Sequence, residues 1–260
     1  MVYVFCTISS KIGEGLMMLK FIGIGDAFNS KDGNTSAYIK FGSEIVFFDM
    51  GEDVFSKAKN KGLFDNISKV HLLITHLHSD HVGSLGTAIA YLYYGVFGMD
   101  NSKICVYFPS SRLVDLLEMQ GVTQNWYTFY INRWDELFID GMDGYPEYIF
   151  EENEHTNALD VDGKSNCYSI ELNVPGRGNL YYSGDCAGVK DRLKSRWNYD
   201  YIYHEVTSFK DVSVHTSYDE LLEAAKGISS SKKKRIYLMH MDEGFDKERA
   251  VKDGFSIAQV

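Results

Sequence analysis

The chain has 260 residues, 45% of them hydrophobic and only three of them proline, which is enough for one large domain with a substantial core. Its 26 basic and 36 acidic side chains give a formal net charge of −10, which disfavours binding to a long polyanion, because sequence-independent affinity for nucleic acid comes mainly from Lys and Arg. A small anionic substrate held by metal ions is compatible with this charge, since bound cations reverse the local field.

Residues 1–17 are mildly apolar but lack the basic start and the small-residue cleavage site of a signal peptide. We interpret them as an extension, or as residues upstream of a start at Met17 or Met18, in front of a single domain that spans 18–260. The four cysteines are scattered with no CxxC pair, and no apolar run reaches the roughly 18–20 residues of a membrane span. These features predict a cytoplasmic protein with reduced cysteines and no membrane insertion.

Short apolar runs that end at Gly, Asn or Asp predict strands joined by turns in the first half of the chain. The runs are 20–25, 36–41, 44–50 and 70–75. Helical patterns follow at about 81–97, 110–120 and 217–228, and further strands are expected near 147–151, 167–173, 179–184, 200–205 and 235–240. Two runs of strands, each followed by helices, predict an α/β protein with two sheets packed face to face and helices outside, a four-layer αββα sandwich.

Metal-binding residue types are concentrated directly after the run 70–75, in the segment His76-Leu77-His78-Ser79-Asp80-His81. His76 and His78 are two residues apart, so in an extended chain they point the same way. Asp80 and His81 lie at the turn into the next helix, where they can bind a second metal ion. Because imidazole nitrogen and carboxylate oxygen are both good ligands for Zn²⁺, the segment predicts a metal centre rather than a set of solvated histidines.

This HxHxDH pattern resembles the first metal motif of the metallo-β-lactamase superfamily, and the resemblance covers about 19–245. It implies the αββα fold of that superfamily. Asp49 ends a segment similar to the family's Asp-x-Gly strand end, and would orient metal ligands by hydrogen bonds. His155, Asp185 in a Ser-Gly-Asp segment, and His240 occupy the family's remaining ligand positions in the expected order.

By this resemblance the site holds two divalent metal ions, with zinc expected first and Mn²⁺ or Fe²⁺ as alternatives. The ligands of one ion would be His76, His78 and His155, those of the other Asp80, His81 and His240, and Asp185 would bridge the two. A metal-binding sensor or an inactive family member is disfavoured, because no expected ligand is missing.

Two further segments resemble those of ribonuclease Z-like phosphodiesterases. His204-Glu205-Val206-Thr207 is similar to their HEAT segment, and His215-Thr216-Ser217 to their HST segment, which opens a helix. Thr216 or Ser217 would cap that helix, and Glu220 could complete a capping box. The resemblance implies catalytic roles for three residues: His215 gives a proton to the leaving group, Glu205 keeps that imidazole charged and aimed, and Asp80 orients a metal-bound hydroxide for attack on phosphorus. A surface histidine beside a helix cap is the alternative for His215.

The chain has no counterpart of the long Gly/Pro- and Lys-rich arm with which enzymes of this branch grip transfer RNA. In size, in the lacking arm and in the retained HEAT and HST segments it is similar to the anti-Pycsar enzymes that degrade cyclic mononucleotides. We therefore predict a metal-dependent phosphodiesterase of a small anionic diester, a cyclic nucleotide. Folded RNA, the substrate of a tRNA 3′-processing endoribonuclease (ribonuclease Z), is the first alternative. A lactonase or thioesterase would share the metal ligands without needing Glu205 and His215.

Three surface features have open interpretations. The aromatic segments 91–97 and 126–138 could stack a base or build a homodimer face, or they could be ordinary core packing. A homodimer is expected because the subfamily is commonly dimeric. The basic run 231–235 predicts a solvated turn, with a phosphate-steering patch as the alternative.

Overall fold

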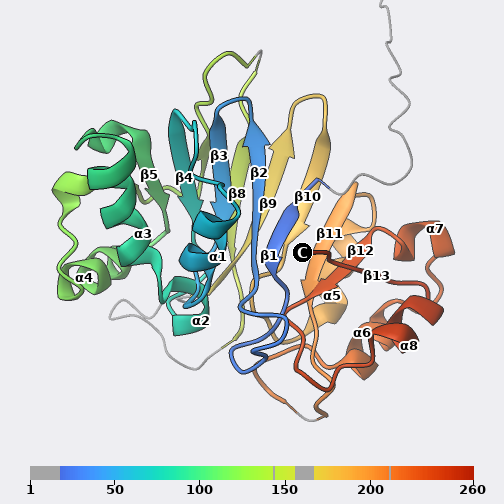
Figure 1. Ribbon diagram of the computed structural model, residues 1–260. Helices are drawn as coiled ribbons and strands as arrows, with labels where there is room; N and C mark the ends of the chain where they lie inside the picture. The colour runs from blue at the N-terminus through green and yellow to red at the C-terminus, as the bar shows by residue number, and fades with distance from the viewer. Residues whose placement is uncertain (1–17, 143, 156–166, 211) are drawn as a thin grey trace, which may run out of the picture.

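Two β-sheets face each other across the middle of the molecule (Figure 1). The computed structural model describes residues 18–142, 144–155, 167–210 and 212–260, so the interpretation of 1–17 lies outside the described residues. Over this part of the chain the first sheet has six strands in the order β1-β2-β3-β4-β5-β6, and the second has seven in the order β13-β12-β11-β10-β9-β8-β7.

Each sheet combines an antiparallel part with a parallel part. The strands of the first sheet are β1 (Lys20–Gly23), β2 (Ser36–Phe41), β3 (Glu44–Phe48), β4 (Lys69–Leu73), β5 (Ile104–Tyr107) and β6 (Thr128–Tyr130), and β3 to β6 are parallel. Those of the second are β7 (Trp134–Glu136), β8 (Glu147–Glu152), β9 (Tyr168–Val174), β10 (Gly178–Tyr182), β11 (Tyr201–Glu205), β12 (Ile236–Met239) and β13 (Ser256–Ile257), and β10 to β13 are parallel. The parallel strands of one sheet therefore end at the same edge of that sheet.

Helices lie outside both sheets (Figure 1). Beside the first sheet lie α1 (Val54–Asn60), α3 (Leu85–Tyr91) and α4 (Arg112–Met119), and beside the second lie α5 (Val189–Arg196), α6 (Tyr218–Ala224), α7 (Ser230–Lys233) and α8 (Lys247–Lys252). The short helix α2 (Ser79–Val82) lies at the lower end of the sandwich in Figure 1. This arrangement confirms the predicted αββα sandwich. None of the described helices is long and apolar enough to cross a bilayer.

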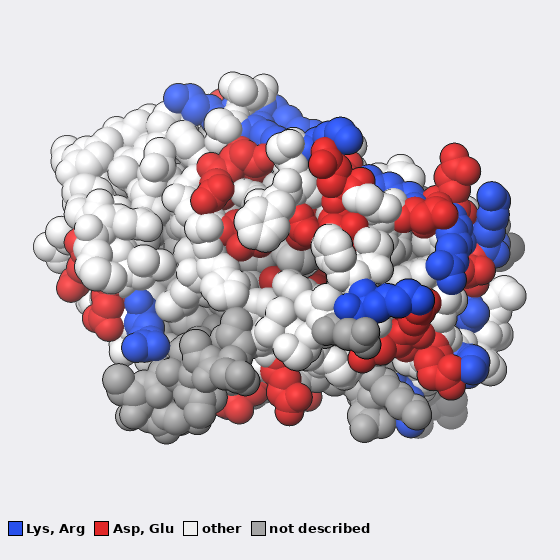
Figure 2. Space-filling view, turned by 90° about the horizontal axis from the view of Figure 1, so that it is seen from below, with Lys and Arg blue, Asp and Glu red and all other residues white. Residues whose placement is uncertain are grey.

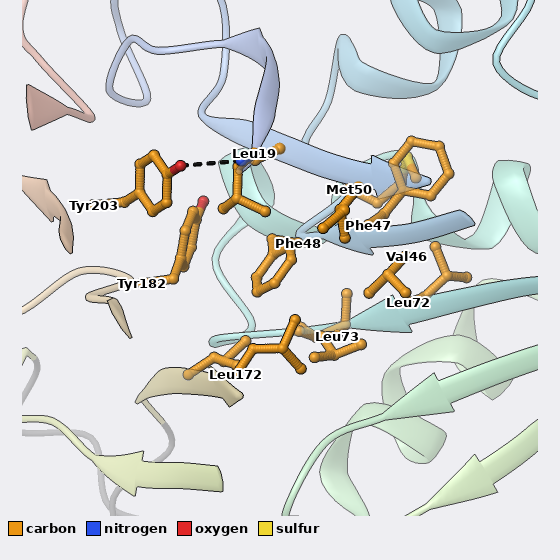
Figure 3. Close-up of a cluster of buried hydrophobic side chains, with 14 of the residues drawn as sticks. Leu19, Val46, Phe47, Phe48, Met50, Leu72, Leu73, Leu172, Tyr182 and Tyr203 are labelled. Carbon is orange, nitrogen blue, oxygen red and sulfur yellow. Dashed lines mark hydrogen bonds between the residues drawn. The ribbon is translucent and has the colours of Figure 1, made fainter. Parts of the chain in front are cut away.

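The main core lies between the two sheets (Figure 3). Phe48 of β3 and Tyr182 of β10 are in contact across it, with ring centroids 5.1 Å apart. Leu19 packs beside them, and its amide donates a buried hydrogen bond of 3.0 Å to the hydroxyl of Tyr203. Burying a large apolar side chain contributes about 1.5–3 kcal/mol, so these inter-sheet contacts hold the strand ends, and the side chains that follow them, in a fixed relation.

The segment 81–97 differs from the single helix expected from its sequence. It consists of the last part of α2, then α3, then a π-helical turn, η1 (Leu92–Val96). The helix is interrupted at Ser84, whose amide donates to the carbonyl of Met50 (3.1 Å) and whose hydroxyl donates to that of Gly51 (2.5 Å). These bonds tie the turn to the end of β3 instead of to the preceding helical turn.

Other boundaries differ less. The helix expected over 217–228 ends at Ala224, shortly before Gly227, which adopts a left-handed conformation with φ of 78°. The basic run 231–235 overlaps α7 and leads into β12, so it lies at the opposite end of that strand from His240. Two short 3-10 helices, η2 (Asn101–Lys103) and η3 (Gln124–Trp126), complete the described helical elements.

The two aromatic segments pack partly against each other. Tyr93 of η1 stacks on Trp126 of η3 with ring centroids 5.7 Å apart. For these two residues the structure therefore favours ordinary packing within the chain. Three other large side chains are largely exposed: Tyr94, Trp134 and Phe138. The expected homodimer face stays a prediction, and these three side chains are its candidates.

A buried group of polar side chains links neighbouring strands of the first sheet. His71 of β4 hydrogen-bonds through Nε2 to Glu44 of β3 (3.0 Å), and the hydroxyl of Tyr107 lies 2.9 Å from its Nδ1. Burial lowers the pKa of His71. Burial alone would raise the pKa of Glu44, but hydrogen bonds from His71 and from the amide of Asp140 lower it overall. The pair is therefore a neutral imidazole that donates to an ionised carboxylate.

We expect Glu44→Gln to lower the free energy of unfolding at pH 7 by about 1.5–3 kcal/mol, the range for a hydrogen bond to a charged group. A carboxyl whose pKa is lower in the folded than in the unfolded state stabilises the fold above its unfolded pKa of about 4.3, and this contribution is lost as pH falls through the folded-state value. The difference from the wild type should thus be constant above about pH 4.3 and narrow below it. Urea denaturation between pH 3 and pH 8 measures this. Tyr107→Phe is the control, because it removes a hydrogen bond to the same imidazole without removing a carboxyl. Its free energy of unfolding should differ from that of the wild type by the same amount down to pH 3. If Glu44→Gln also shows a constant difference down to pH 3, the ionised state assigned to Glu44 is contradicted.

Candidate metal centre

The ends of parallel strands from both sheets meet at the lower end of the sandwich in Figure 1. β4 leads into the segment that contains His76, β10 into Asp185, and β12 into His240. His155 follows β8 on the second sheet. Segments far apart in the sequence thereby bring the predicted ligands to one place.

One group of side chains surrounds Oδ2 of Asp185. Nε2 of His76 lies 3.6 Å from this oxygen and Nε2 of His155 lies 3.5 Å from it. Nδ1 of His78 lies 3.2 Å from Nε2 of His155. The donor atoms of all four residues lie within 4.8 Å of one another, and His78 is the exposed member of the group.

A second group surrounds Oδ1 of the same carboxylate. Nε2 of His81 lies 3.2 Å and Nε2 of His240 lies 3.3 Å from this oxygen. Oδ2 of Asp80 lies 3.2 Å from each of the same two nitrogens. The two groups therefore share Asp185, with one carboxylate oxygen in each, which is the arrangement that the family resemblance implies.

The spacing of these donor atoms fits two cations. Four ligands about 2.0–2.2 Å from a tetrahedral zinc ion lie roughly 3.3–3.6 Å apart, and the separations from Asp185 run from 3.2 to 3.6 Å. Nε2 of His76 and Oδ1 of Asp185 are buried and make no hydrogen bond to the described residues. Nε2 of His81 and Nε2 of His240 lie only 3.4 Å apart. A buried polar atom without a partner costs free energy, and a cation in each group would supply the missing interaction.

Hydrogen bonds from outside the two groups orient the histidine rings. Nδ1 of His155 donates to the carbonyl of Val214 at 2.6 Å, which leaves Nε2 pointing at Asp185. Nδ1 of His76 lies 3.1 Å from the hydroxyl of Thr75. Such bonds fix the tautomer and the ring direction of histidines that bind metal.

Asp49 occupies the orienting position that its sequence motif predicts. Its carboxylate accepts hydrogen bonds from Nδ1 of His81 (2.9 Å) and from the amide of Thr75 (2.7 Å), and it is fully buried. Asp49 and His240 both have left-handed backbones, with φ of 62° and 53°. Residues other than glycine seldom adopt this conformation, and it is typical of functional sites when the surrounding structure enforces it.

The carboxylates of the site favour positive charge. Burial opposes protonation of His240, yet Asp185, Asp80 and Glu205 raise its pKa to about 10. The same kind of environment raises the pKa of His81 well above its usual value, again against the effect of burial. In the first group, by contrast, burial lowers the pKa of His76 and His78, so these rings are neutral and each keeps one nitrogen free of a proton. The second group, which stabilises protons on buried imidazoles, also attracts divalent cations, which compete with those protons for the ring nitrogens.

Glu205 and His215 form a hydrogen-bonded pair beside the second group. Glu205 is fully buried, and its Oε2 lies 2.7 Å from Nδ1 of His215. Its Oε1 accepts from the amides of Cys186 (2.6 Å) and Thr216 (3.2 Å). Burial works against the charge on both side chains. The hydrogen bond from His215, together with the nearby His240, whose Nδ1 lies 3.7 Å from Oε2, lowers the pKa of Glu205, and the bond to Glu205 raises the pKa of His215. The His215 side chain keeps 25% exposure, and its ring lies beside those of His155 and His240.

The position of His215 follows from the helix that it precedes. Ser217 is the N-cap of α6 and forms the predicted capping box with Glu220: its hydroxyl accepts from the Glu220 amide (3.3 Å), and the Glu220 carboxylate accepts from the Ser217 amide (2.9 Å). His215 lies two residues before this cap, with its ring centroid 4.8 Å from that of His155 and 5.4 Å from that of His240.

Two polar residues of the site carry no motif that would have predicted them. The side-chain amide of Asn153 donates to the carbonyls of Ser183 (2.5 Å) and Asp185 (3.1 Å), and thereby fixes the turn that presents the bridging carboxylate. Asp242 accepts hydrogen bonds from Thr207 and Ser208. In both cases the partners lie about 30 residues away in the sequence, so no local pattern marks the residue.

A close approach of two backbone segments holds α2 in place. The amide of Met50 donates to the carbonyl of His81 (2.7 Å), and a Cβ atom on Gly51 would lie 2.0 Å from the carbonyl oxygen of Asp80. We expect Gly51→Ala to push α2 away from β3, to cost about 1–3 kcal/mol of stability as overpacking does, and to weaken metal binding. Thermal unfolding with and without zinc, together with a zinc titration, measures both effects. Gly95→Ala, whose Cβ would meet its nearest neighbour at 3.4 Å, is the matched control, and wild-type zinc affinity in Gly51→Ala would contradict the role of this contact.

Figure 2 shows this end of the molecule from below. Asp and Glu side chains gather around the middle of the face and on its right side, and much of its left part is uncharged. Lys and Arg side chains lie mainly along the upper edge and on the right side of this face, next to acidic ones. With a net charge of −10 for the chain, such a surface is unfavourable for a long polyanion. Cations bound at the site would change the sign of the field locally and favour a small anion.

In a comparison with known proteins, one family model matches nearly the whole chain. The family model described as Anti-Pycsar protein Apyc1 matches residues 17–258. The Anti-Pycsar protein Apyc1 of Bacillus phage BSP38 is 25% identical over 247 residues, which cover 88% of this chain and 90% of that protein. A Ribonuclease Z of Pyrococcus furiosus is 24% identical over 267 residues, covering 85% and 84% of the two chains. Among solved structures, the metallo-β-lactamase fold protein YhfI from Bacillus subtilis has a TM-score of 0.67 at 17% identity, covering 91% of this chain and 90% of that one.

Proposed function

The chain belongs to the Anti-Pycsar protein Apyc1 family and has the metallo-β-lactamase fold, and from this premise we propose that it is a metal-dependent phosphodiesterase that hydrolyses a cyclic nucleotide. The observation that carries the proposal is the hydrogen bond between His215 and the buried Glu205, beside two ligand groups that share Asp185. A hydrolase that uses the metal ligands alone has no need of this pair, whereas a phosphodiesterase with an alkoxide leaving group does.

The proposed metal ligands are those that the sequence predicts, and two divalent cations, zinc first, are the proposed cofactors. The ligands of one ion are His76, His78 and His155, those of the other are Asp80, His81 and His240, and Asp185 is common to both. When bound, such cations lower the pKa of a water molecule and draw charge from a phosphoryl oxygen. Asp80 is proposed also to orient the attacking water, because its carboxylate lies within the second ligand group, 3.2 Å from Nε2 of both His81 and His240.

His215 is the proposed proton donor. Nδ1 of its ring is bonded to Glu205, so Nε2 is the atom that can give a proton to the leaving oxygen. The ionised Glu205 favours the protonated ring, and the raised pKa of His215 keeps that proton available near neutral pH. The amides of Cys186 and Thr216 hold the other carboxylate oxygen, so the imidazole is aimed by a group that cannot rotate freely.

A compact diester suits this site better than a folded RNA. The net charge of −10 and the acidic side chains around the lower face offer little for a long phosphate backbone, so most of the binding energy would have to come from the metal centre. A cyclic nucleotide presents a single phosphodiester and needs no extended basic surface. Ribonuclease Z activity is the second candidate, favoured by the similarity to the Pyrococcus furiosus protein.

A hydrolysis screen tests the proposal. The purified protein, loaded with Zn²⁺ or Mn²⁺, is given 3′,5′- and 2′,3′-cyclic nucleotides, bis(p-nitrophenyl) phosphate, precursor tRNA and a panel of lactones and thioesters. We expect turnover of at least one cyclic nucleotide and slow or no cleavage of precursor tRNA. Efficient cleavage of precursor tRNA with intact cyclic nucleotides would replace this proposal by ribonuclease Z activity, and turnover of lactones alone would exclude both.

We also propose a homodimer and a cytoplasmic location. The exposed Tyr94, Trp134 and Phe138 support a dimer face, since exposed large apolar side chains often mark interfaces. The buried thiols of Cys105, Cys167 and Cys186 form no disulfide among the described residues, which suits a reducing compartment. Light scattering tests the homodimer, and a monomer at micromolar concentration would overturn it.

Fractionation of the native host tests the cytoplasmic location, and recovery of the protein outside the cytoplasm would overturn it.

A further inference from the structure

Asp242 is a buried carboxylate that uses both its oxygens on one neighbouring segment. It lies two residues after His240 and is 5% exposed. Its Oδ1 accepts from the hydroxyl of Thr207 (2.9 Å) and from the amide of Ser208 (2.6 Å), and its Oδ2 accepts from the hydroxyl of Ser208 (2.7 Å). A carboxylate with three such bonds fixes the backbone to which it is bonded, since hydrogen bonds to a charged acceptor are the strong ones.

The segment held by Asp242 is the base of the loop that carries His215. The amide of Thr207 donates to the carbonyl of Thr216 (3.0 Å), and the amide of Tyr218 donates to the carbonyl of Thr207 (2.9 Å). These bonds close the loop between Thr207 and Thr216, and His215 is the last residue before the closure. Any shift of Thr207 is therefore passed directly to the backbone next to His215.

We propose that Asp242 is a positioning residue, which joins the loop of His215 to the end of β12 and so sets the position of that imidazole relative to His240. The inference rests on the proposed function, because it assigns Asp242 a part in placing the proton donor of that reaction. The rings of His215 and His240 are nearly parallel, with centroids 5.4 Å apart and planes at 26°. Glu205 and the Thr216 hydroxyl anchor the same loop to β11 and to the carbonyl of Cys186. The amide of Val206 bonds to Met239 of β12 (3.1 Å), and Asp242 extends this link by holding Thr207 and Ser208 to the segment that follows β12.

A displacement of His215 should affect only the step in which a proton is transferred to the leaving group. A proton donor must lie within hydrogen-bond reach of the leaving oxygen while the phosphate is held by other groups. Displacement of such a group by about 1 Å can cost roughly 100-fold in rate. A nitrophenolate leaves without a proton, whereas the alkoxide of a cyclic nucleotide needs one, so the two substrates report separately on the donor and on the rest of the site.

The first experiment compares Asp242→Ala with the wild type on these two diesters, both enzymes carrying the same measured metal content. We expect kcat for the cyclic nucleotide to fall by about 100-fold with little change in KM, and kcat for bis(p-nitrophenyl) phosphate to fall by less than about threefold. Asp242→Asn should restore most of the activity, because its amide oxygen can accept from Thr207 and Ser208 and its NH₂ group can donate to the Ser208 hydroxyl. Equal losses on both diesters, or no loss on either, would overturn the proposal.

A double-mutant cycle identifies the path from Asp242 to His215. Thr207→Val removes the hydroxyl that donates to Asp242. If Asp242 acts through this segment, the double variant should lose little more than Asp242→Ala alone, whereas independent sites would give multiplied losses. Asp246→Ala removes an exposed carboxylate four residues further along, at the start of α8, and should leave both rates unchanged. Multiplied losses in the double variant would overturn the proposed path.

A readout without turnover separates this inference from the proposed function. In a ¹H–¹⁵N spectrum of the histidine side chains, the Nδ1 proton of His215 should be protected from exchange by its bond to Glu205 in the wild type and in Asp246→Ala. It should exchange faster in Asp242→Ala. If no diester is hydrolysed by the wild type, the proposed function fails, but faster exchange of the His215 proton would still support the positioning role. An unchanged His215 signal in Asp242→Ala would overturn the positioning role whatever the activity.

Discussion

Replacement of His215 by alanine is expected to slow the hydrolysis of a cyclic nucleotide by about 10²–10⁴-fold, the usual contribution of a positioned general acid. The reason is the leaving group: an alkoxide is a poor one, and Nε2 of His215 is the atom proposed to protonate it. The loss should fall on kcat more than on KM, because the proton moves only in the transition state. Steady-state kinetics on a cyclic nucleotide and on bis(p-nitrophenyl) phosphate measure this, and the nitrophenyl diester should lose far less.

The matched variant is Glu205→Gln, which keeps the shape of the side chain but removes the charge that favours the protonated imidazole. It should show the same preference for the alkoxide substrate, with a smaller loss than His215→Ala. A thioester, whose thiolate leaves without a proton, should be cleaved, if it is turned over at all, equally well by the wild type and by His215→Ala. Equal losses of His215→Ala on every ester would leave His215 as a structural residue beside a helix cap, and the phosphodiesterase assignment would lose its main support.

The sequence predicted the fold because its signals are local. Apolar runs such as 44–50 and 70–75 end at turn residues, and the alternation of strands and helices leads to the layered sandwich. The short strands β5, β6, β7 and β13 were not predicted, since two to four residues are too few to establish an alternating pattern. The break at Ser84 depends on bonds to Met50 and Gly51, and no helical periodicity can anticipate a partner more than 30 residues away.

The residues of the candidate site also separate into those that a local sequence signal predicts and those that depend on distant partners. One contiguous motif can be recognised from local sequence alone: His76, His78, Asp80 and His81. His155, Asp185 and His240 were found only because the resemblance supplies their order, since a single histidine after a strand has no local signature. Asn153 and Asp242 had neither a motif nor a place in that order. Their roles come from hydrogen bonds to Asp185 and Thr207, which exist only after the strand ends have met.

Asp185→Asn is expected to reduce the bound metal from two equivalents to one or fewer and to slow diester hydrolysis by at least about 100-fold, because a preorganised charge at the reacting centre is lost. The carboxylate faces one ligand group with each oxygen, so its amide analogue keeps the shape but removes the negative charge that both groups share. Metal analysis after dialysis, and thermal unfolding with and without added zinc, measure the effect. A ligand present at 100 times its dissociation constant stabilises the folded state by about 2.7 kcal/mol, which corresponds to a rise of roughly 5–10 °C in Tm for a chain of this size. Chelation should remove that rise in the wild type, while in Asp185→Asn added zinc should produce little of it.

The control is Asp246→Asn, which changes an exposed carboxylate at the start of α8 and should bind two equivalents of metal. If Asp185→Asn also binds two equivalents and shows the full rise in Tm, then Asp185 does not bridge the ions, and the histidines and Asp80 must hold them without a shared ligand.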